Sequence, residues 1–520
     1  MESTEEESKY FVKEGFLSSP SLSYPHIDLA PVYNFDKIEE LSNKEVKGQG
    51  KKKKTKLKLM ENEAVPYPNI TIIDVKVNAR GVSEDSDYLS NIDILKNIRR
   101  GNSFLKFNDE SGKSQLIVGR KGMIKFYDIY REMLEEGSEE KQVTKKDGKS
   151  RLVEDKKKSF TQMNVTLAGP YKSFEDGYKV EMVKTLKANG ENAQVSWNSQ
   201  LGLWVFCSKN VAMLAKSRDD LEAYDQSENP LRFQFSKLIA NCWFDKLEEI
   251  EANGINVEDL KKDIDGKTLI GEYCGDPNHV HLIFYPKIRI IFYTMVENGD
   301  LESPTQESID SCLLPEKSME VFKKYGLDTV TYESLGVFST YASMKETLTE
   351  TYKNIARAPI VTDEEGSVIY FVRRRVDESQ DEDRVLSLGK LKTLEYRLYR
   401  KLREKTKGTS HRLRTKGASG TSEKKVWESV VTKFKNESRD LVRGIGGGDK
   451  MLTQTELNFY FNLAEVATQK LYDEPEQQDY IQDNYLVFLT SLIPELDATR
   501  LTSKIFEIQS EISYEKPEIS

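Results

Sequence analysis

One lysine in the chain has the neighbours that a nucleophile needs. Lys187 opens the tetrapeptide KANG (187–190), which lies between two strand-like runs at 179–186 and 192–197. A neutral lysine amine can attack the α-phosphate of a nucleoside triphosphate and keep the nucleotide as a phosphoramidate, provided that its pKa falls from about 10.4. A glycine after the lysine lets the backbone pass close to a nucleotide. The pattern therefore predicts a covalent nucleotide carrier, although so short a motif also recurs by chance on protein surfaces.

Short motifs downstream of Lys187 supply the charged groups that this chemistry requires. The phosphates need cations around them, and a metal ion needs a carboxylate. Basic and acidic residues follow within the runs LWVFCSKN, LIGEYCG, DEEGSVIYF and KLK. The candidates in these runs are Lys209, Glu272, Glu365, Lys390 and Lys392. Each of them alone is equally typical of a solvated surface, so the indication comes from the whole set and its order.

In this order the motifs resemble those of the lysine-dependent nucleotidyltransferases, the superfamily of ATP-dependent RNA and DNA ligases and mRNA capping enzymes. The first motif of that superfamily is K-x-[DN]-G, and the spelling KANG looks most like the RNA ligases. The resemblance implies that Lys187 is the nucleophile and that Lys209 is the basic residue of the following strand. It also implies that Glu272 binds the ribose.

The later motifs of the family carry further implied roles. The acid of E-G-x-V helps to place the metal and the attacking lysine, which implies this role for Glu365. The K-x-K motif binds the α-phosphate, which implies that role for Lys390 and Lys392. An aromatic strand residue stacks on the purine, and RIIFYTMVEN offers Phe292 for this position. Tyr293 and Met295 stay open as alternatives, because the sequence does not fix the register of this strand.

Two elements upstream of Lys187 also resemble features of phage-type RNA ligases. These ligases carry R-G and K-F-F-N elements that help to orient the triphosphate. Arg80-Gly81 and Lys106-Phe107-Asn108 are similar, although the second lacks one phenylalanine and both lie far upstream of Lys187. An ordinary strand end and turn would explain them equally well.

The resemblance implies an α+β fold, in which an antiparallel-sheet nucleotidyltransferase domain (ATP-grasp-like ligase) is followed by an α-helical C-terminal domain. It implies ATP as nucleotide donor, Mg²⁺ as metal, and RNA with 5′-phosphate and 3′-hydroxyl ends as partner, with other end-processing proteins as possible associates. Three alternatives stay open: a DNA ligase, a capping-type nucleotidyltransferase, and a catalytically silent RNA-binding or structural subunit. The β-rich domain that usually follows K-x-K in DNA ligases and capping enzymes has no counterpart in the sequence, which argues against the first two.

The candidate residues depend on strands and helices that must position them. Runs rich in β-branched and aromatic residues predict strands at 70–77, 114–120, 179–186, 192–197, 203–209, 268–274, 280–285, 289–296 and 367–374. Apolar residues at helical spacing predict helices at 124–136, 233–254 and 341–356. Because strands and helices mix irregularly, the pattern favours an α+β fold with antiparallel sheets.

Shifts in composition divide the chain into five predicted regions. Residues 133–160 are polar and charged and read as a linker or insertion, and the residues after about 393 have helical patterns. The predicted regions are a flexible arm with a lysine run (1–65), an N-terminal α+β part of the ligase (66–132), the linker (133–160), a nucleotidyltransferase domain (161–400) and a helical C-terminal domain (401–520).

Composition favours a protein of the cell interior. The 520 residues are 38% hydrophobic, with no run of about 18 apolar residues that would predict a membrane span. The N-terminal MESTEEESKY lacks the basic and apolar pattern of a signal peptide. Four scattered cysteines are typical of a reducing compartment, so we expect a cytoplasmic or nuclear location without a membrane partner. The net charge of −9 means that any contact with nucleic acid needs local basic patches.

Overall fold

Lys187 and most of the other candidates lie in or next to the strands of two five-stranded sheets. The computed structural model describes most of residues 35–400 and three isolated residues beyond them, and its longest gaps are 78–83, 130–161, 277–282, 302–309 and 358–364. The linker and the C-terminal helical domain that the sequence predicts lie outside the described residues. Among the described residues, no helix is long and apolar enough to cross a membrane.

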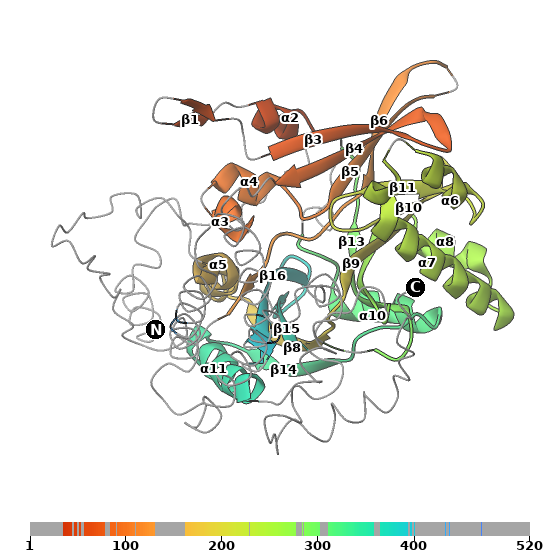
Figure 1. Ribbon diagram of the computed structural model, residues 1–520. Helices are drawn as coiled ribbons and strands as arrows, with labels where there is room; N and C mark the ends of the chain where they lie inside the picture. The colour runs from red at the N-terminus through yellow and green to blue at the C-terminus, as the bar shows by residue number, and fades with distance from the viewer. Residues whose placement is uncertain are drawn as a thin grey trace.

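The first sheet has the strand order β14-β8-β15-β16-β7. Its strands are β14 (Tyr332–Phe338), β8 (Lys179–Lys187), β15 (Gly366–Arg374), β16 (Arg384–Lys392) and β7 (Tyr127–Asp128). The neighbours pair antiparallel except β16 and β7, which run parallel. Helices α5 (Gln162–Glu175) and α11 (Tyr341–Arg357) pack on one face, where their apolar residues share a core with β8 and β15. Figure 1 shows both helices on the same side of this sheet.

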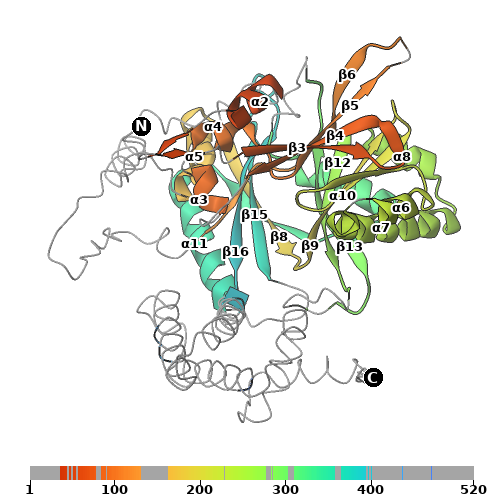
Figure 2. The same cartoon turned by 45° about the horizontal axis from the view of Figure 1, so that its top comes forward.

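The second sheet has the order β11-β10-β9-β12-β13 and is antiparallel throughout. Its strands are β9 (Glu191–Asn198), β10 (Leu203–Cys207), β11 (Ala212–Ala215), β12 (Lys267–Cys274) and β13 (Arg289–Glu297). The short α6 (Asp220–Ala223) follows β11, and α7 (Gln234–Ala252), α8 (Val257–Ile264) and α10 (Pro315–Lys324) share the large aromatic core of this sheet. In Figure 2 the first sheet lies between α11 on one side and the second sheet on the other.

A third, four-stranded sheet precedes the other two in the chain. It has the order β3-β4-β5-β6, with β3 (Leu57–Ala64), β4 (Tyr67–Val77), β5 (Asn102–Asn108) and β6 (Ser114–Arg120). The helices α2 (Phe35–Asn43), α3 (Glu84–Leu89) and α4 (Ile92–Asn97) contribute apolar residues to its core, and a small hairpin joins β1 (Val46–Gly48) to β2 (Lys51–Lys53). The antiparallel α+β architecture expected from the sequence is therefore confirmed for the described residues.

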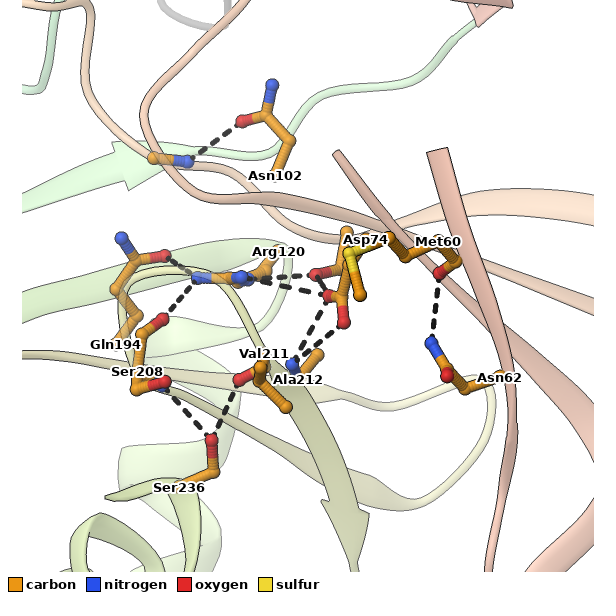
Figure 3. Close-up of polar contacts among 12 residues, drawn as sticks. Met60, Asn62, Asp74, Asn102, Arg120, Gln194, Ser208, Val211, Ala212 and Ser236 are labelled. Atoms are coloured by element: carbon orange, nitrogen blue, oxygen red, sulfur yellow. Dashed lines mark hydrogen bonds and ion pairs between the residues drawn. The ribbon is translucent and has the colours of Figure 1, made fainter. Parts of the chain in front are cut away.

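A buried ion pair within the third sheet makes further hydrogen bonds to the second sheet (Figure 3). Asp74 of β4 and Arg120 of β6 are each 1% exposed, and their side chains approach to 3.8 Å. Arg120 also donates to the Gln194 side chain of β9 over 2.8 Å and to the Ser208 carbonyl over 3.0 Å. The Asp74 carboxylate accepts from the backbone N–H of Ala212, at the start of β11. The buried polar groups of Asp74 and Arg120 therefore find part of their hydrogen-bond partners in the second sheet.

Three local predictions are wrong. In the strand predicted at 280–285, the described residues Ile283 and Tyr285 do not belong to a strand. The helix predicted at 124–136 is absent from its described part, because Tyr127–Asp128 forms β7 and pairs with β16. Buried Tyr127 and Ile129 fit an extended edge strand as well as a helix, and the partner strand decides. Residues 57–64 are strand β3 rather than part of an arm, since Leu57 is buried against the third sheet. The lysine run that precedes Leu57 made the whole segment look like a solvated arm in the sequence.

Candidate active site

Three strand ends of the first sheet meet at one place. β8 ends at Lys187 and β16 ends at Lys392, and Gly366 at the start of β15 lies opposite both lysines in the register. Glu365 comes directly before β15, and its backbone N–H donates to the Lys187 carbonyl over 3.0 Å. The antiparallel pairing therefore holds one carboxyl group between two lysines that are far apart in the sequence.

The side chains at these strand ends form a compact charged cluster. The Lys187 Nζ lies 3.0 Å from Glu365 Oε2, and the Lys392 Nζ lies 3.0 Å from Glu365 Oε1. The Asn189 side chain donates to Glu365 Oε2 over 3.0 Å. The exposed fractions of the Lys187, Glu365 and Lys392 side chains are only 15%, 4% and 10%. The three charged groups are thus largely shielded from solvent, and each is stabilised by its ion pair with a neighbour.

Two motif glycines are required by the backbone. Gly366 has φ 143°, and a Cβ there would lie 2.1 Å from the Leu391 carbonyl oxygen of β16. At Gly190 a Cβ would lie 2.2 Å from the Tyr273 carbonyl oxygen of β12. Only glycine fits such close approaches, so both glycines let neighbouring strands carry the charged residues into one cluster.

Lys187 and Glu365 hold each other in their charged forms. Burial alone would lower the pKa of Lys187, but the carboxylates of Glu365 and Glu272 outweigh burial and raise this pKa above its ordinary value. Burial would likewise raise the pKa of Glu365, but Lys187 and Lys392 outweigh it and lower the pKa to about 2. In the free protein Lys187 is therefore an ammonium group, which has to lose a proton before it can act as a nucleophile.

The charged cluster opens into a pocket of about 290 Å³ between the first and second sheets. This volume suits a small organic ligand. Apolar contacts come from Leu186, Ile270 and Val368, and polar ones from Asn192 and Gln194 of β9. The charged lining residues are Arg100, Lys187, Glu191, Lys209, Glu272, Glu365, Lys390, Lys392 and Arg400. A lining in which cations outnumber carboxylates suits a ligand with several negative charges.

Lys390 differs from the other lysines of the pocket. Burial is the main cause that lowers the pKa of its ammonium group to about 7, and the nearby cations Arg100, Lys125 and Lys392 lower it further against the opposing effect of Asp128. Its Nζ lies 4.5 Å from the centre of the Phe126 ring. Lys390 is therefore only partly charged at neutral pH, and it gains charge when an anion comes near.

Six residues that the sequence singled out line this one pocket: Lys187, Lys209, Glu272, Glu365, Lys390 and Lys392. Phe292 does not. Its side chain is 1% exposed and packs in the core against Trp243 and Phe322. The next residue, Tyr293, lines the pocket and accepts a hydrogen bond from Asn192 over 3.4 Å. Successive strand residues face opposite ways, so the structure brings the alternative Tyr293, and not Phe292, to the pocket.

The upstream candidates have different outcomes. Lys106 is exposed on β5 and does not line the pocket, because the strand alternation turns it away from its buried neighbours Leu105 and Phe107. Arg80 lies outside the described residues. Arg100, which comes shortly before β5, lines the pocket instead.

Sequence reasoning also missed several polar residues of the site. The sequence indicated Asn189 only as a member of the KANG motif. In the structure its side chain donates a hydrogen bond to Glu365 and another to the Tyr396 hydroxyl over 3.1 Å. Gln194 reaches the pocket from β9 and accepts from Arg120. The alternation of β9 after the KANG motif was the only signal for Gln194, and it does not distinguish the two faces of the strand.

Comparisons with known proteins identify similar structures but no family. No family model and no curated protein matches the chain. Among solved structures, an archaeal ATP-dependent RNA ligase has 12% identity over 71% of this chain and 68% of its own, with a TM-score of 0.35. A protein of Aquifex aeolicus assigned as an ATP-dependent DNA ligase has 12% identity over 72% and 75%, with a TM-score of 0.32. A Naegleria gruberi RNA ligase variant, solved with AMP and Mn, has 12% identity over 66% and 97%, with a TM-score of 0.27.

Proposed function

We propose that the protein is an ATP-dependent RNA ligase that works through a lysyl-AMP intermediate at Lys187. The observation that carries the proposal is the buried set of Lys187, Glu365 and Lys392 at three adjacent strand ends, facing a pocket of about 290 Å³. A nucleophilic amine, a carboxylate that controls its charge and a lysine for the phosphate are the groups that adenylyl transfer needs.

In the first step the Lys187 amine, after losing its proton, attacks the α-phosphorus of ATP. A P–N bond forms, the bond between the α-phosphorus and the bridging oxygen breaks, and pyrophosphate leaves. Lys392 shares Glu365 with the nucleophile, and Lys390 and Lys209 line the same pocket, so all three can stabilise the charge that develops on the phosphoryl oxygens.

In the second step an oxygen of an RNA 5′-phosphate attacks the phosphorus of the adenylate. The P–N bond breaks, Lys187 takes up a proton, and the RNA carries an activated 5′ end. In the third step an RNA 3′-hydroxyl, which loses its proton to solvent, attacks the 5′-phosphate. The phosphoanhydride bond to the adenylate breaks, AMP leaves and a phosphodiester forms. The preference for RNA rests on the spelling of the KANG motif, and direct comparison of RNA with DNA tests it.

The donor set fits a magnesium ion that shares its ligands with the substrate. Within the described ranges, no three His, Cys, Asp or Glu side chains could hold a metal by themselves. Mg²⁺ usually takes one or two protein carboxylates and completes its shell with phosphates and water. Glu365 and Glu272 line the same pocket, and Glu365 stays ionised with a pKa of about 2. A bound ion would neutralise phosphate charge there.

The function is tested with ATP labelled at the α-phosphate and with nicked duplexes. A ligase of this kind carries the label on the protein with ATP in preference to GTP, and it seals nicked RNA faster than nicked DNA. Labelling from GTP alone would favour a capping-type enzyme, and faster sealing of DNA would favour a DNA ligase. A folded protein that is free of bound AMP and takes no label would overturn the proposal.

Tyr293, rather than its neighbour Phe292, is expected to stack on the adenine. Replacing Tyr293 by alanine should raise the KM for ATP roughly tenfold, since stacking of a base on an aromatic ring contributes about 1–3 kcal/mol. Phe292→Leu serves as the control, because Phe292 belongs to the core. It should lower the unfolding free energy by about 1 kcal/mol and leave the KM unchanged. A higher KM in the Phe292 variant alone would reverse this assignment.

ATP binding should be coupled to proton uptake at Lys390. The pKa of Lys390 is lowered to about 7, so the free amine is mostly neutral at pH 8. Nucleotide phosphates favour the ammonium form and raise this pKa, and ATP should therefore bind less tightly as the pH rises above 7. Calorimetry at pH 8 in buffers of different ionisation enthalpy measures the uptake. We expect the Lys390→Met variant to lose it, and equal uptake in both proteins would contradict the prediction.

A further inference from the structure

Four cations from separate parts of the chain gather at one side of the pocket. We call Arg100, Lys125, Lys209 and Lys390 the basic wall. Arg100, Lys209 and Lys390 line the pocket, and Lys125 lies close enough to them that Arg100 adds to burial in lowering its pKa and that it adds to burial in lowering the pKa of Lys390. Basic groups that act on one another in this way hold their positive charge poorly unless an anion lies among them.

Two carboxylates of the same chain supply that anion. Glu84 and Asp85 form the first turn of α3. Glu84 Oε2 lies 2.5 Å from the Lys209 Nζ and 4.0 Å from the Lys125 Nζ, and its Oε1 lies 4.0 Å from the Arg100 Nε. Asp85 Oδ1 lies 2.5 Å from the Lys125 Nζ. The acidic pair therefore contacts three of the four cations directly.

The charge of the acidic pair is set by these cations. Burial alone would raise the pKa of both carboxyl groups, but the cations, Lys125 first among them, outweigh burial and lower both pKa values below their ordinary range. Lys390 is among the cations that act on Asp85. Both carboxylates are therefore ionised at neutral pH and neutralise part of the basic wall.

The acidic side chains can leave without unfolding the helix. Asp87 and Tyr88 of α3 are each 1% exposed, and Tyr88 belongs to the core of the third sheet, so the backbone is anchored. The side chains of Glu84 and Asp85 keep exposed fractions of 20% and 40% and can rotate toward solvent. Carboxylates in the first turn of a helix remain favourable after such a rotation.

We propose that Glu84 and Asp85 are an internal competitor for phosphate, which occupies the basic wall until a phosphate group of the substrate displaces it. A phosphate carries more charge and more acceptor oxygens than a carboxylate, so it can replace the pair at these cations. The competitor weakens phosphate binding, rejects ligands with little charge and speeds the release of the inorganic product. The proposal rests on a pocket that takes phosphate groups, as the proposed function requires.

The test measures the affinity of the full-length protein for inorganic pyrophosphate by calorimetry. We expect Glu84→Gln to bind pyrophosphate roughly tenfold more tightly than the wild type, and the double variant with Asp85→Asn to bind more tightly still, since a nearby like charge opposes an anion strongly. The matched control is Glu258→Gln with Asp259→Asn. These are first-turn acids of α8 that pair with Lys261 and Lys262, and neither lines the pocket. The control should bind as the wild type does.

An unchanged or weaker affinity in the Glu84 variants would overturn the proposal, because it would mean that the acids only hold the cations in place. Circular dichroism checks the fold of each variant. If Glu84→Gln does not fold, Asp85→Asn alone is measured in its place and should also bind pyrophosphate more tightly than the wild type. Labelling with ATP is measured in parallel. Tighter pyrophosphate binding in the Glu84 variants without any labelling would contradict the ligase function and support the internal competitor. Labelling together with unchanged pyrophosphate binding would support the ligase function and contradict the internal competitor.

Discussion

A Lys187→Ala variant, incubated with magnesium and ATP labelled at the α-phosphate, is expected to carry no label on a denaturing gel. The alanine side chain has no atom that can form the P–N bond. The loss of label should therefore be complete, and the overall sealing rate should fall by a factor of about 10⁴ or more. The variant should be less stable but still fold, since Lys187 lies at the end of β8 and Glu365 keeps its ion pair with Lys392.

Lys184→Ala is the matched control for this result. Lys184 belongs to the same strand, pairs with Glu333 at 2.6 Å and does not line the pocket. Its loss should leave the labelling unchanged. A labelled Lys187→Ala protein would mean that another residue is the nucleophile, and the proposed mechanism would then be wrong at its first step.

Replacing Glu365 by glutamine is expected to have the second largest effect, and to change the rate in two ways. The maximal rate of labelling should fall by roughly 100-fold, because the carboxylate that positions Lys187 loses its charge. The pH at which the rate reaches half its maximum should also fall, since Glu365 is the nearest group that raises the pKa of Lys187. A pH–rate profile of labelling separates the two effects. A lower rate with an unmoved profile would contradict the charge coupling.

The same variant should be less stable. Glu365 is shared by two lysines that are largely buried, and removing one partner of a buried ion pair costs about 3–5 kcal/mol. The pKa of Glu365 is lowered from 4.5 to about 2 in the folded protein, so its stabilisation is complete above pH 4.5 and is lost as the pH falls toward 2. Urea unfolding should show a large difference from wild type at pH 7 that shrinks below pH 4.

Glu333→Gln provides the comparison for stability. Glu333 also pairs with a lysine of β8, but 62% of its side chain is exposed. Exposed ion pairs contribute about 0–1 kcal/mol, so this variant should unfold almost as the wild type does. Equal losses in both variants would mean that burial of the Glu365 cluster has no special effect.

The sequence predicts the centre of the site better than its edges. Lys187, Glu365 and Lys392 were found because each belongs to a short motif at a strand end, and antiparallel pairing brings such ends together. The register of β13 could not be found in this way. Apolar and aromatic residues occupy both of its faces, since β13 has the core on one side and the pocket on the other. Alternation therefore could not distinguish Phe292 from Tyr293.

Contacts between distant segments explain the remaining differences. Nothing near Glu84 in the sequence indicates that it meets Lys209, which lies in the turn after β10 and belongs to another sheet. The pairing of β7 with β16 is equally remote, and it replaces the predicted helix at 124–136. Such contacts depend on how the sheets pack, and local patterns carry no information on packing.

The ion pair of Asp74 and Arg120 has a consequence for dividing this protein into modules. Arg120 belongs to the third sheet, yet it holds Gln194, which lines the pocket between the other two sheets. Separating the third sheet would take away the guanidinium group from which Gln194 accepts a hydrogen bond, and it would expose the ion pair of Asp74 and Arg120, whose side chains are each 1% exposed in the intact protein. The segment before Lys187 is thus not an appendage to a minimal catalytic core. We therefore expect the third sheet to unfold together with the second sheet, to which Arg120 and Asp74 are hydrogen-bonded.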